Sequence, residues 1–142
     1  ELTEGMLMKW PEQVIPVMHA LRRRGFEISL DDFGMGHSSL SLLKTLPISS
    51  MKIDRSFVRD LSLQSRDQAI AQTIVDLGRH MCLDVIAEGI ETDSQLAILS
   101  QLGCKLIQGY LLGRPMALAD LLVQFPSGRF ARADRPSLVR PD

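Results

Sequence analysis

Short apolar runs in this chain repeatedly end at a polar side chain, and each end is followed by turn residues and then a helix-like pattern. The residues that close the runs are Glu1, Asp31 with Asp32, Lys52, Glu88 and Gln108. Burying carboxylates, an ammonium and an amide is costly unless the groups meet one another or a ligand. We therefore expect these side chains to converge on one face of the fold.

The alternation of strand-like and helix-like stretches predicts an α/β fold with a parallel sheet and crossover helices. The expected strands end at Glu1 and cover residues 26–30, 51–53, 85–87 and 106–107. The expected helices cover residues 12–24, 65–81, 92–102 and 118–123, with another capped at Ser38 or Ser39 and running to about Leu46. A closed (β/α)8 barrel needs about 250 residues, and its strand C-termini form the catalytic face. The chain is therefore a little over half of such a barrel, or else a small open α/β sheet.

Composition narrows the class of protein. At 142 residues the chain suits one modest domain, and a net charge of -1 offers no basic surface for a nucleic-acid polymer. No apolar run approaches the ~18 residues of a membrane span, so we expect no membrane contact from this segment. Cys82 and Cys104 suit neither a disulfide framework nor a zinc site, which predicts a cytoplasmic location. Because the chain starts at Glu1 without an initiator Met, we expect a piece of a longer protein.

Four of the residues that close the runs are hard oxygen donors: Glu1, Asp31, Asp32 and Glu88. Such donors are typical ligands of Mg²⁺ or Mn²⁺, whereas zinc is disfavoured because no His or Cys closes a run. Asp31 and Asp32 would point to opposite faces of a regular strand, but a bend at the strand end would let both reach one or two metals. Acidic residues after strands also act as helix caps or in ion pairs, so the pattern alone leaves both interpretations open.

Paired metals beside an ammonium suit in-line attack of water on a phosphodiester. Lys52 would then position or polarise the water, or offset the charge that builds on the phosphate. Glu88 would hold a metal and help to take the proton of the water.

Five motifs, in the right order and separation, carry a resemblance to a known family. They are Glu1-Leu2-Thr3-Glu4, Asp31-Asp32-Phe33-Gly34-x-Gly-x-Ser-Ser-Leu, Leu46-Pro47-Ile48 followed by Lys52-Ile53-Asp54-Arg55-Ser56-Phe57-Val58, Ala87-Glu88-Gly89-Ile90-Glu91, and Gln108-Gly109-Tyr110-Leu111 with Arg114-Pro115. Together they resemble the C-terminal part of an EAL domain, the cyclic di-GMP phosphodiesterase family. The resemblance implies that residues 1–125 supply about the last five β/α units of a TIM-like (β/α)8 barrel, with 126–142 as a polar C-terminal tail. It also implies hydrolysis of cyclic di-GMP to linear pGpG with Mg²⁺ or Mn²⁺.

Roles for individual residues follow from the same resemblance. Two metals would be bound by Glu1, Asp31, Asp32 and Glu88, with Glu88 also able to act as the base. Lys52 would orient the attacking water, and Gln108 would help to hold water or the second metal. Glu4 and Glu91 would support the loop after Asp32 and the catalytic face. That loop, with Phe33, Gly34, Gly36 and Ser38, is the flexible element that links the metal site to dimer contacts in the family.

Three departures from the family pattern are visible. The Glu-Ala-Leu motif and the metal-binding Asn after it are absent, Met35-Gly36-His37 replaces the usual Thr-Gly-Tyr, and Ser49 replaces an Asp. We therefore expect weak or no activity from the isolated chain.

We also expect a homodimer, and a parent protein that can carry sensor or GGDEF-type domains. The alternative function is a catalytically inactive module that binds cyclic di-GMP or a protein partner, but the visible metal residues are intact, which favours the enzyme. A truncated chain that cannot close its barrel is the third possibility.

Overall fold

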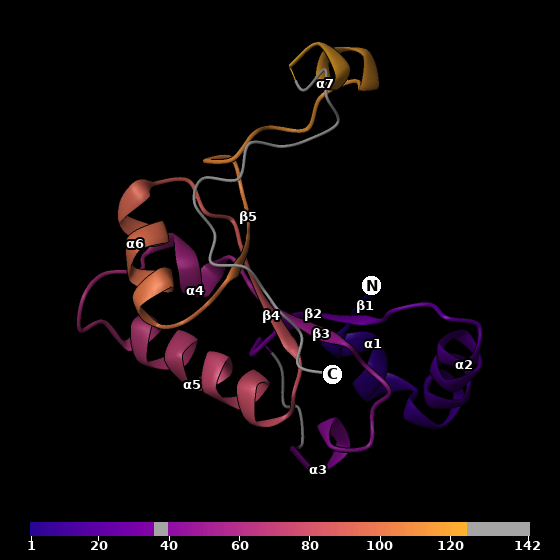
Figure 1. Ribbon diagram of the computed structural model, residues 1–142. Helices are drawn as coiled ribbons and strands as arrows, with labels where there is room; N and C mark the ends of the chain where they lie inside the picture. The colour runs from indigo at the N-terminus through magenta and orange to yellow at the C-terminus, as the bar shows by residue number, and fades with distance from the viewer. Residues whose placement is uncertain (36–39, 125–142) are drawn as a thin grey trace.

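A parallel sheet of five strands, in the order β1-β2-β3-β4-β5, organises the computed structural model, which describes residues 1–35 and 40–124 (Figure 1). The strands are β1 (Leu2–Thr3), β2 (Ser29–Phe33), β3 (Ser50–Ile53), β4 (Asp84–Glu88) and β5 (Leu106–Gln108). The helices are α1 (Glu4–Lys9), α2 (Pro11–Arg23), α3 (Leu40–Leu43), α4 (Ser56–Arg59), α5 (Arg66–His80), α6 (Asp93–Gln101) and α7 (Leu118–Gln124). Every neighbouring pair of strands is parallel, so the predicted α/β class is confirmed.

The two faces of the sheet differ in chemistry because successive strand residues point to opposite sides. Met51, Ile53 and Ala87 are fully buried and belong to the same apolar core as Ile74 and Val75 of α5. Crossovers between consecutive parallel strands have one hand, which places the connecting helices on one face of the sheet. The other face, which would be the interior of a closed barrel, carries the polar residues of the candidate site.

The N-terminal helices differ from the expectation of a single helix over residues 12–24. Thr3 starts a separate helix, α1, because its Oγ1 accepts a hydrogen bond from the Met6 N–H at 3.3 Å. The second helix, α2, begins at Pro11, a residue suited to the first helical turn. It then continues through Pro16, which lies inside the helix.

The predicted strand over residues 26–30 was misplaced, since β2 runs from Ser29 to Phe33. Gly25, with φ +85°, ends α2, and the Phe26 N–H still donates to the Leu21 carbonyl at 3.2 Å. Phe26 therefore belongs to the end of the helix. Asp31 and Asp32 consequently lie within the strand rather than after it.

Strands β3, β4 and β5 and helices α5, α6 and α7 lie within one or two residues of their predicted bounds. Helix α3 ends earlier than expected, at Leu43, and α4 was not predicted because four residues leave no periodic pattern. The proposed caps Ser38 and Ser39 lie outside the described residues, as does the predicted tail over 126–142.

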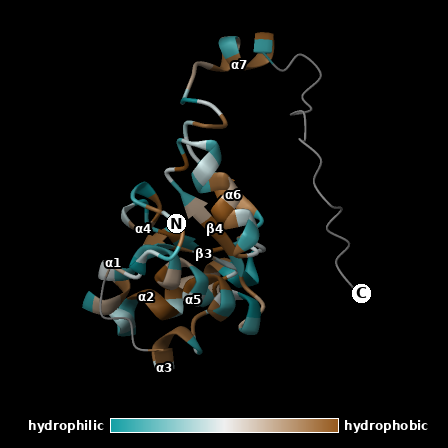
Figure 2. Cartoon of the chain, turned by 90° about the vertical axis from the view of Figure 1, so that its left-hand side faces the viewer, coloured by the Kyte–Doolittle hydropathy of each residue, from teal (hydrophilic) through white to brown (hydrophobic). Residues whose placement is uncertain are grey.

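Helix α7 lies apart from the sheet in both views (Figures 1 and 2). Its Leu118, Leu122 and Val123 side chains are 69%, 57% and 82% exposed. Within residues 1–35 and 40–124, no helix combines the length and the apolar character needed to cross a membrane.

Candidate active site

Lys52 is the centre of the polar face. It lies on β3 and is only 4% exposed. Its Nζ is 2.8 Å from Glu1 Oε1 and 3.7 Å from Asp31 Oδ1, and it also forms an ion pair with Glu88 Oε1. The structure thus brings together four of the residues expected to converge. Asp31, Lys52 and Glu88 lie in β2, β3 and β4, and Glu1 lies just before β1.

The protonation of Lys52 follows from these contacts. Burial alone would lower the pKa of Lys52, but hydrogen bonds to Glu1 and Glu88 and the charge of Asp31 outweigh burial and raise it above its ordinary value. The contact with Lys52 also lowers the pKa of Glu1. Lys52 is therefore an ammonium at physiological pH, and it can supply charge and hydrogen bonds but cannot act as a base.

Strand β2 bends where Asp31 and Asp32 lie. The pairing register with β3 shifts between Leu30 and Phe33, and Asp32 has φ +55°. Asp is one of the few residues other than glycine that adopt this left-handed conformation readily. The Asp32 N–H donates to Asp31 Oδ1 at 3.0 Å. The bend expected from the adjacent pair is therefore present.

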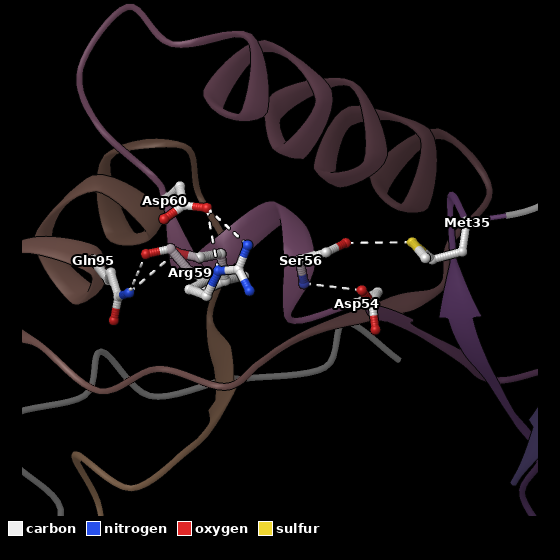
Figure 3. Close-up of polar contacts among 7 residues, drawn as sticks. Met35, Asp54, Ser56, Arg59, Asp60 and Gln95 are labelled. Atoms are coloured by element: carbon white, nitrogen blue, oxygen red, sulfur yellow. Dashed lines mark hydrogen bonds and ion pairs between the residues drawn. The ribbon is translucent and has the colours of Figure 1, made fainter.

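Asp54 belongs to the acidic cluster, since its charge acts on Asp32. Burial raises the pKa of Asp32, and the charges of Asp31 and Asp54 raise it further. Burial opposes ionisation of Asp54 as well, but hydrogen bonds from Ser56 outweigh burial, so the pKa of Asp54 is lowered. The Ser56 N–H donates to Asp54 Oδ1 at 2.9 Å (Figure 3). The signal in the sequence was the Lys52-x-Asp54 spacing, because residues two apart on a strand share a face.

Glu4 contacts the segment after β2. It is 2% exposed, and its Oε2 accepts a hydrogen bond from the Gly34 N–H at 3.2 Å. Gly34 has φ +99°, and a Cβ there would lie 2.9 Å from the Phe57 ring. Phe33 is buried. The other two loop residues that were singled out, Gly36 and Ser38, lie outside the described part of the chain.

Gln108 and Glu91 are placed less centrally. Gln108 is paired with Glu88 in the sheet but is exposed. A pocket of about 340 Å³ beside it is lined by Tyr110 and Arg114, whose guanidinium lies 4.3 Å from the centre of the tyrosine ring. Glu91 is exposed, and its backbone N–H donates to Gln95 Oε1 at 2.8 Å.

The donor set suits a hard divalent cation. Glu1, Asp31 and Glu88 supply oxygens to one small volume. The pKa of Asp32 is raised by burial and then by the negative charges of Asp31 and Asp54, which a cation would offset. Among the described residues, no three His, Cys, Asp or Glu side chains are arranged to hold an ion directly, since the carboxylates surround the Lys52 ammonium instead. The residues fit the cation by charge and ligand type.

A parallel sheet in sequential order with connecting helices, whose polar face holds a buried lysine among carboxylates, is typical of β/α-barrel proteins. The EAL domain family matches residues 1–115, and the chain belongs to this family.

Two relatives come from Pseudomonas aeruginosa. The chain is 47% identical over 121 residues to cyclic di-GMP phosphodiesterase NbdA, covering 85% of this chain and 16% of the relative. It is also 47% identical over 122 residues to the bifunctional diguanylate cyclase/cyclic di-GMP phosphodiesterase MucR, covering 86% and 18%. The chain thus spans less than a fifth of the length of these relatives.

Solved structures confirm the predicted barrel class. The PaMucR phosphodiesterase in complex with c-di-GMP superposes with a TM-score of 0.81 at 46% identity, covering 85% of this chain and 49% of that chain. A manganese/cy-diGMP complex of Klebsiella pneumoniae BlrP1 gives a TM-score of 0.74 at 36% identity, covering 80% and 29%.

Proposed function

We propose that the protein carrying this chain hydrolyses cyclic di-GMP to linear pGpG with bound divalent cations. The observation that supports this most is the convergence of Glu1, Asp31 and Glu88 on Lys52 on the polar face of the sheet. A chain of the EAL domain family with these residues intact is expected to act on the dinucleotide that the PaMucR structure binds.

The cations are proposed to be Mg²⁺ or Mn²⁺, two of them, held by Glu1, Asp31, Asp32 and Glu88. BlrP1 supports this choice, since its complex contains manganese. When bound, such ions polarise the attacking water and stabilise charge on the phosphate.

The side chains of the site would transfer the proton, orient the water and stabilise charge on the phosphate. Hydrolysis joins a water oxygen to phosphorus and breaks the bond from phosphorus to one ribose oxygen, which receives a proton. Glu88 would take the proton of the water, because its side chain is 20% exposed and therefore reachable. Lys52, held as an ammonium, would orient the water or offset charge on the phosphate, and the Gln108 amide would help to hold the water.

The wider setting is also a proposal. We infer a homodimer with sensor or GGDEF-type domains in the parent protein, and the name of MucR as a diguanylate cyclase and phosphodiesterase supports the second part. A cytoplasmic location is supported by Cys82 and Cys104, which are free thiols, the first exposed and the second buried.

The test is turnover of cyclic di-GMP by the product of the complete reading frame, with Mg²⁺ and with Mn²⁺. Glu88→Gln should lower turnover by about 100-fold or more in a protein that still folds, because it removes the proton acceptor but keeps the side chain's shape. Glu12→Gln, at an exposed position of α2, is the control and should leave turnover unchanged. Wild-type turnover in Glu88→Gln would refute the role of Glu88. Binding of cyclic di-GMP without turnover by the wild type would instead identify an inactive binding module.

A further inference from the structure

Gln95 has a side-chain amide that is bonded at both ends. It is the third residue of α6 and is 7% exposed. Its Oε1 accepts hydrogen bonds from the N–H groups of Glu91 and Thr92, at 2.8 and 3.0 Å. Its Nε2 donates to the carbonyl oxygens of Val58 and Arg59, at 3.1 and 3.2 Å (Figure 3). These four bonds use both hydrogens of the amide nitrogen and two acceptor sites of the oxygen.

The two ends of the amide serve different purposes. The accepting end completes a capping box with Thr92, whose Oγ1 accepts from the Gln95 N–H at 3.3 Å. A capping box does not require the donating end, and a glutamate would serve it equally well. The bonds to Val58 and Arg59 therefore need another explanation.

The donating end joins the segments that follow two residues of the site. Val58 and Arg59 lie in α4, which follows β3 and Lys52. Glu91 and Thr92 follow β4 and Glu88. The Gln95 amide is thus a tether between the chain that leaves Lys52 and the chain that leaves Glu88.

The two residues between Glu88 and Glu91 are tightly packed, so the backbone from Glu88 to Glu91 has little freedom to move. Gly89 has φ +73°, and a Cβ there would lie 2.7 Å from the Cβ of Arg55, just before α4. Ile90 is fully buried, its N–H donates to the Gln108 carbonyl at 3.2 Å, and its carbonyl accepts from the Leu111 N–H at 3.0 Å. A displacement at Glu91 is therefore passed on to Glu88 and Gln108.

We propose that Gln95 is a positioning residue, which sets the placement of the Glu88 carboxylate relative to the Lys52 ammonium through its bonds to Val58 and Arg59. Its effect on turnover rests on the proposed phosphodiesterase function, whereas its effect on the backbone after Glu88 does not.

The test replaces only the donating end of the amide. Gln95→Glu keeps an oxygen for the Glu91 and Thr92 N–H groups but turns an oxygen toward two carbonyl groups. Thr92→Ala is the matched variant, because it weakens the cap of α6 and keeps the tether. Gln101→Glu adds the same charge at an exposed position of the same helix.

Two quantities are measured on the product of the complete reading frame. The first is kcat and KM for cyclic di-GMP with Mn²⁺, where a misplaced Glu88 should lower kcat by roughly 10- to 100-fold with KM nearly unchanged. The second is hydrogen exchange of the backbone amides of residues 89–92, which should become faster in Gln95→Glu but not in Gln101→Glu. Thr92→Ala should keep kcat within about twofold of the wild type, since it leaves the bonds to α4 in place.

The outcomes separate the alternatives. An unchanged kcat in Gln95→Glu, or an equal loss in Thr92→Ala at the same melting temperature, would overturn the proposal, because the residue would then act only through helix stability. If the wild type shows no turnover, the proposed phosphodiesterase function is wrong. Independently of turnover, unchanged hydrogen exchange at residues 89–92 in Gln95→Glu would overturn the proposed tether. If Gln95→Glu does not fold, Gln95→Met, which is apolar and of similar length, is compared with Thr92→Ala by kcat alone, because it also removes the oxygen that accepts from the Glu91 and Thr92 N–H groups.

Discussion

Several carboxylates share one ammonium in the candidate site, and this imbalance decides how single residues behave. Glu1, Asp31 and Glu88 contact Lys52, whereas burial and the charges of Asp31 and Asp54 together outweigh the charge of Lys52 at Asp32. The consequence is that Lys52 holds its proton more tightly than usual and Asp32 gives its proton up less readily. A bound cation would relieve the second effect.

The raised pKa of Asp32 predicts a pH dependence of stability. The folded protein keeps the Asp32 proton at pH values where the unfolded chain has lost it, so stability falls as pH rises from the ordinary value of 3.8 through the raised one. Asp32→Asn has no proton to lose. In the presence of EDTA, the free energy of unfolding of Asp32→Asn minus that of the wild type should therefore increase as pH rises through this window. Above the window this difference should stay constant.

Urea unfolding of the complete protein at a series of pH values from about 4 to about 7 measures this difference. Asp60→Asn is the control, since the exposed ion pair of Asp60 with Arg59 contributes little. A difference between Asp32→Asn and wild type that stays constant with pH would contradict the raised pKa.

Individual site residues could be predicted only where their place in the sequence pattern, such as the end of an apolar run, indicates where the side chain lies in the fold. The strand ends gave Glu1, Asp31, Lys52 and Glu88, and these do meet. Gln95 could not be found in this way, because its importance lies in which two segments its amide joins. Such a contact depends on how α4 packs against the start of α6, and no periodic pattern in the sequence predicts that packing.

At the scale of elements, the ends of strands and helices carry the site. Long helices with clear caps, such as α5 after Ser65 and α6 after Thr92, were predictable from side-chain chemistry alone. The start of β2 was not, because Phe26 looks like a strand residue but completes the end of α2. Local propensity cannot distinguish an apolar residue that continues a helix cap from one that starts a strand.

Gly109, just after β5, lies against the backbone of Ile90, which follows β4. A substitution at Gly109 therefore tests how closely these two segments pack. A Cβ at Gly109 would lie 2.1 Å from the Ile90 carbonyl oxygen and 2.3 Å from its nitrogen. Backbone atoms cannot move aside as a flexible side chain can, so Gly109→Ala should lower the free energy of unfolding by about 1–3 kcal/mol. Chemical denaturation measures this loss.

Gly113→Ala is the control for Gly109→Ala, because a Cβ at Gly113 meets nothing within 4 Å. Its effect should stay within about 0.5 kcal/mol. Equal stabilities for the two variants would show that β5 does not pack against the Ile90 backbone as described.

At the scale of the whole molecule, the parallel α/β class could be predicted because each β/α unit repeats one local pattern. A parallel sheet in sequential order is the simplest arrangement of such units, and it places all the polar strand ends on one side. The same arrangement leaves β1 and β5 as edges of the described sheet, each paired on one side only. It also leaves Leu118, Leu122 and Val123 of α7 exposed.

These edges and apolar side chains predict how the 142-residue chain behaves when it is produced alone. Unpaired strand edges recruit other strands, and exposed leucine and valine side chains favour association. We therefore expect species larger than the 15.8 kDa monomer in sedimentation velocity, in proportions that rise with concentration. Leu122→Lys combined with Val123→Lys should reduce this association if α7 contributes, and should leave it unchanged if the strand edges alone drive it. A monomer at all concentrations would mean that the edges are covered within the chain itself, contrary to the arrangement of β1 and β5.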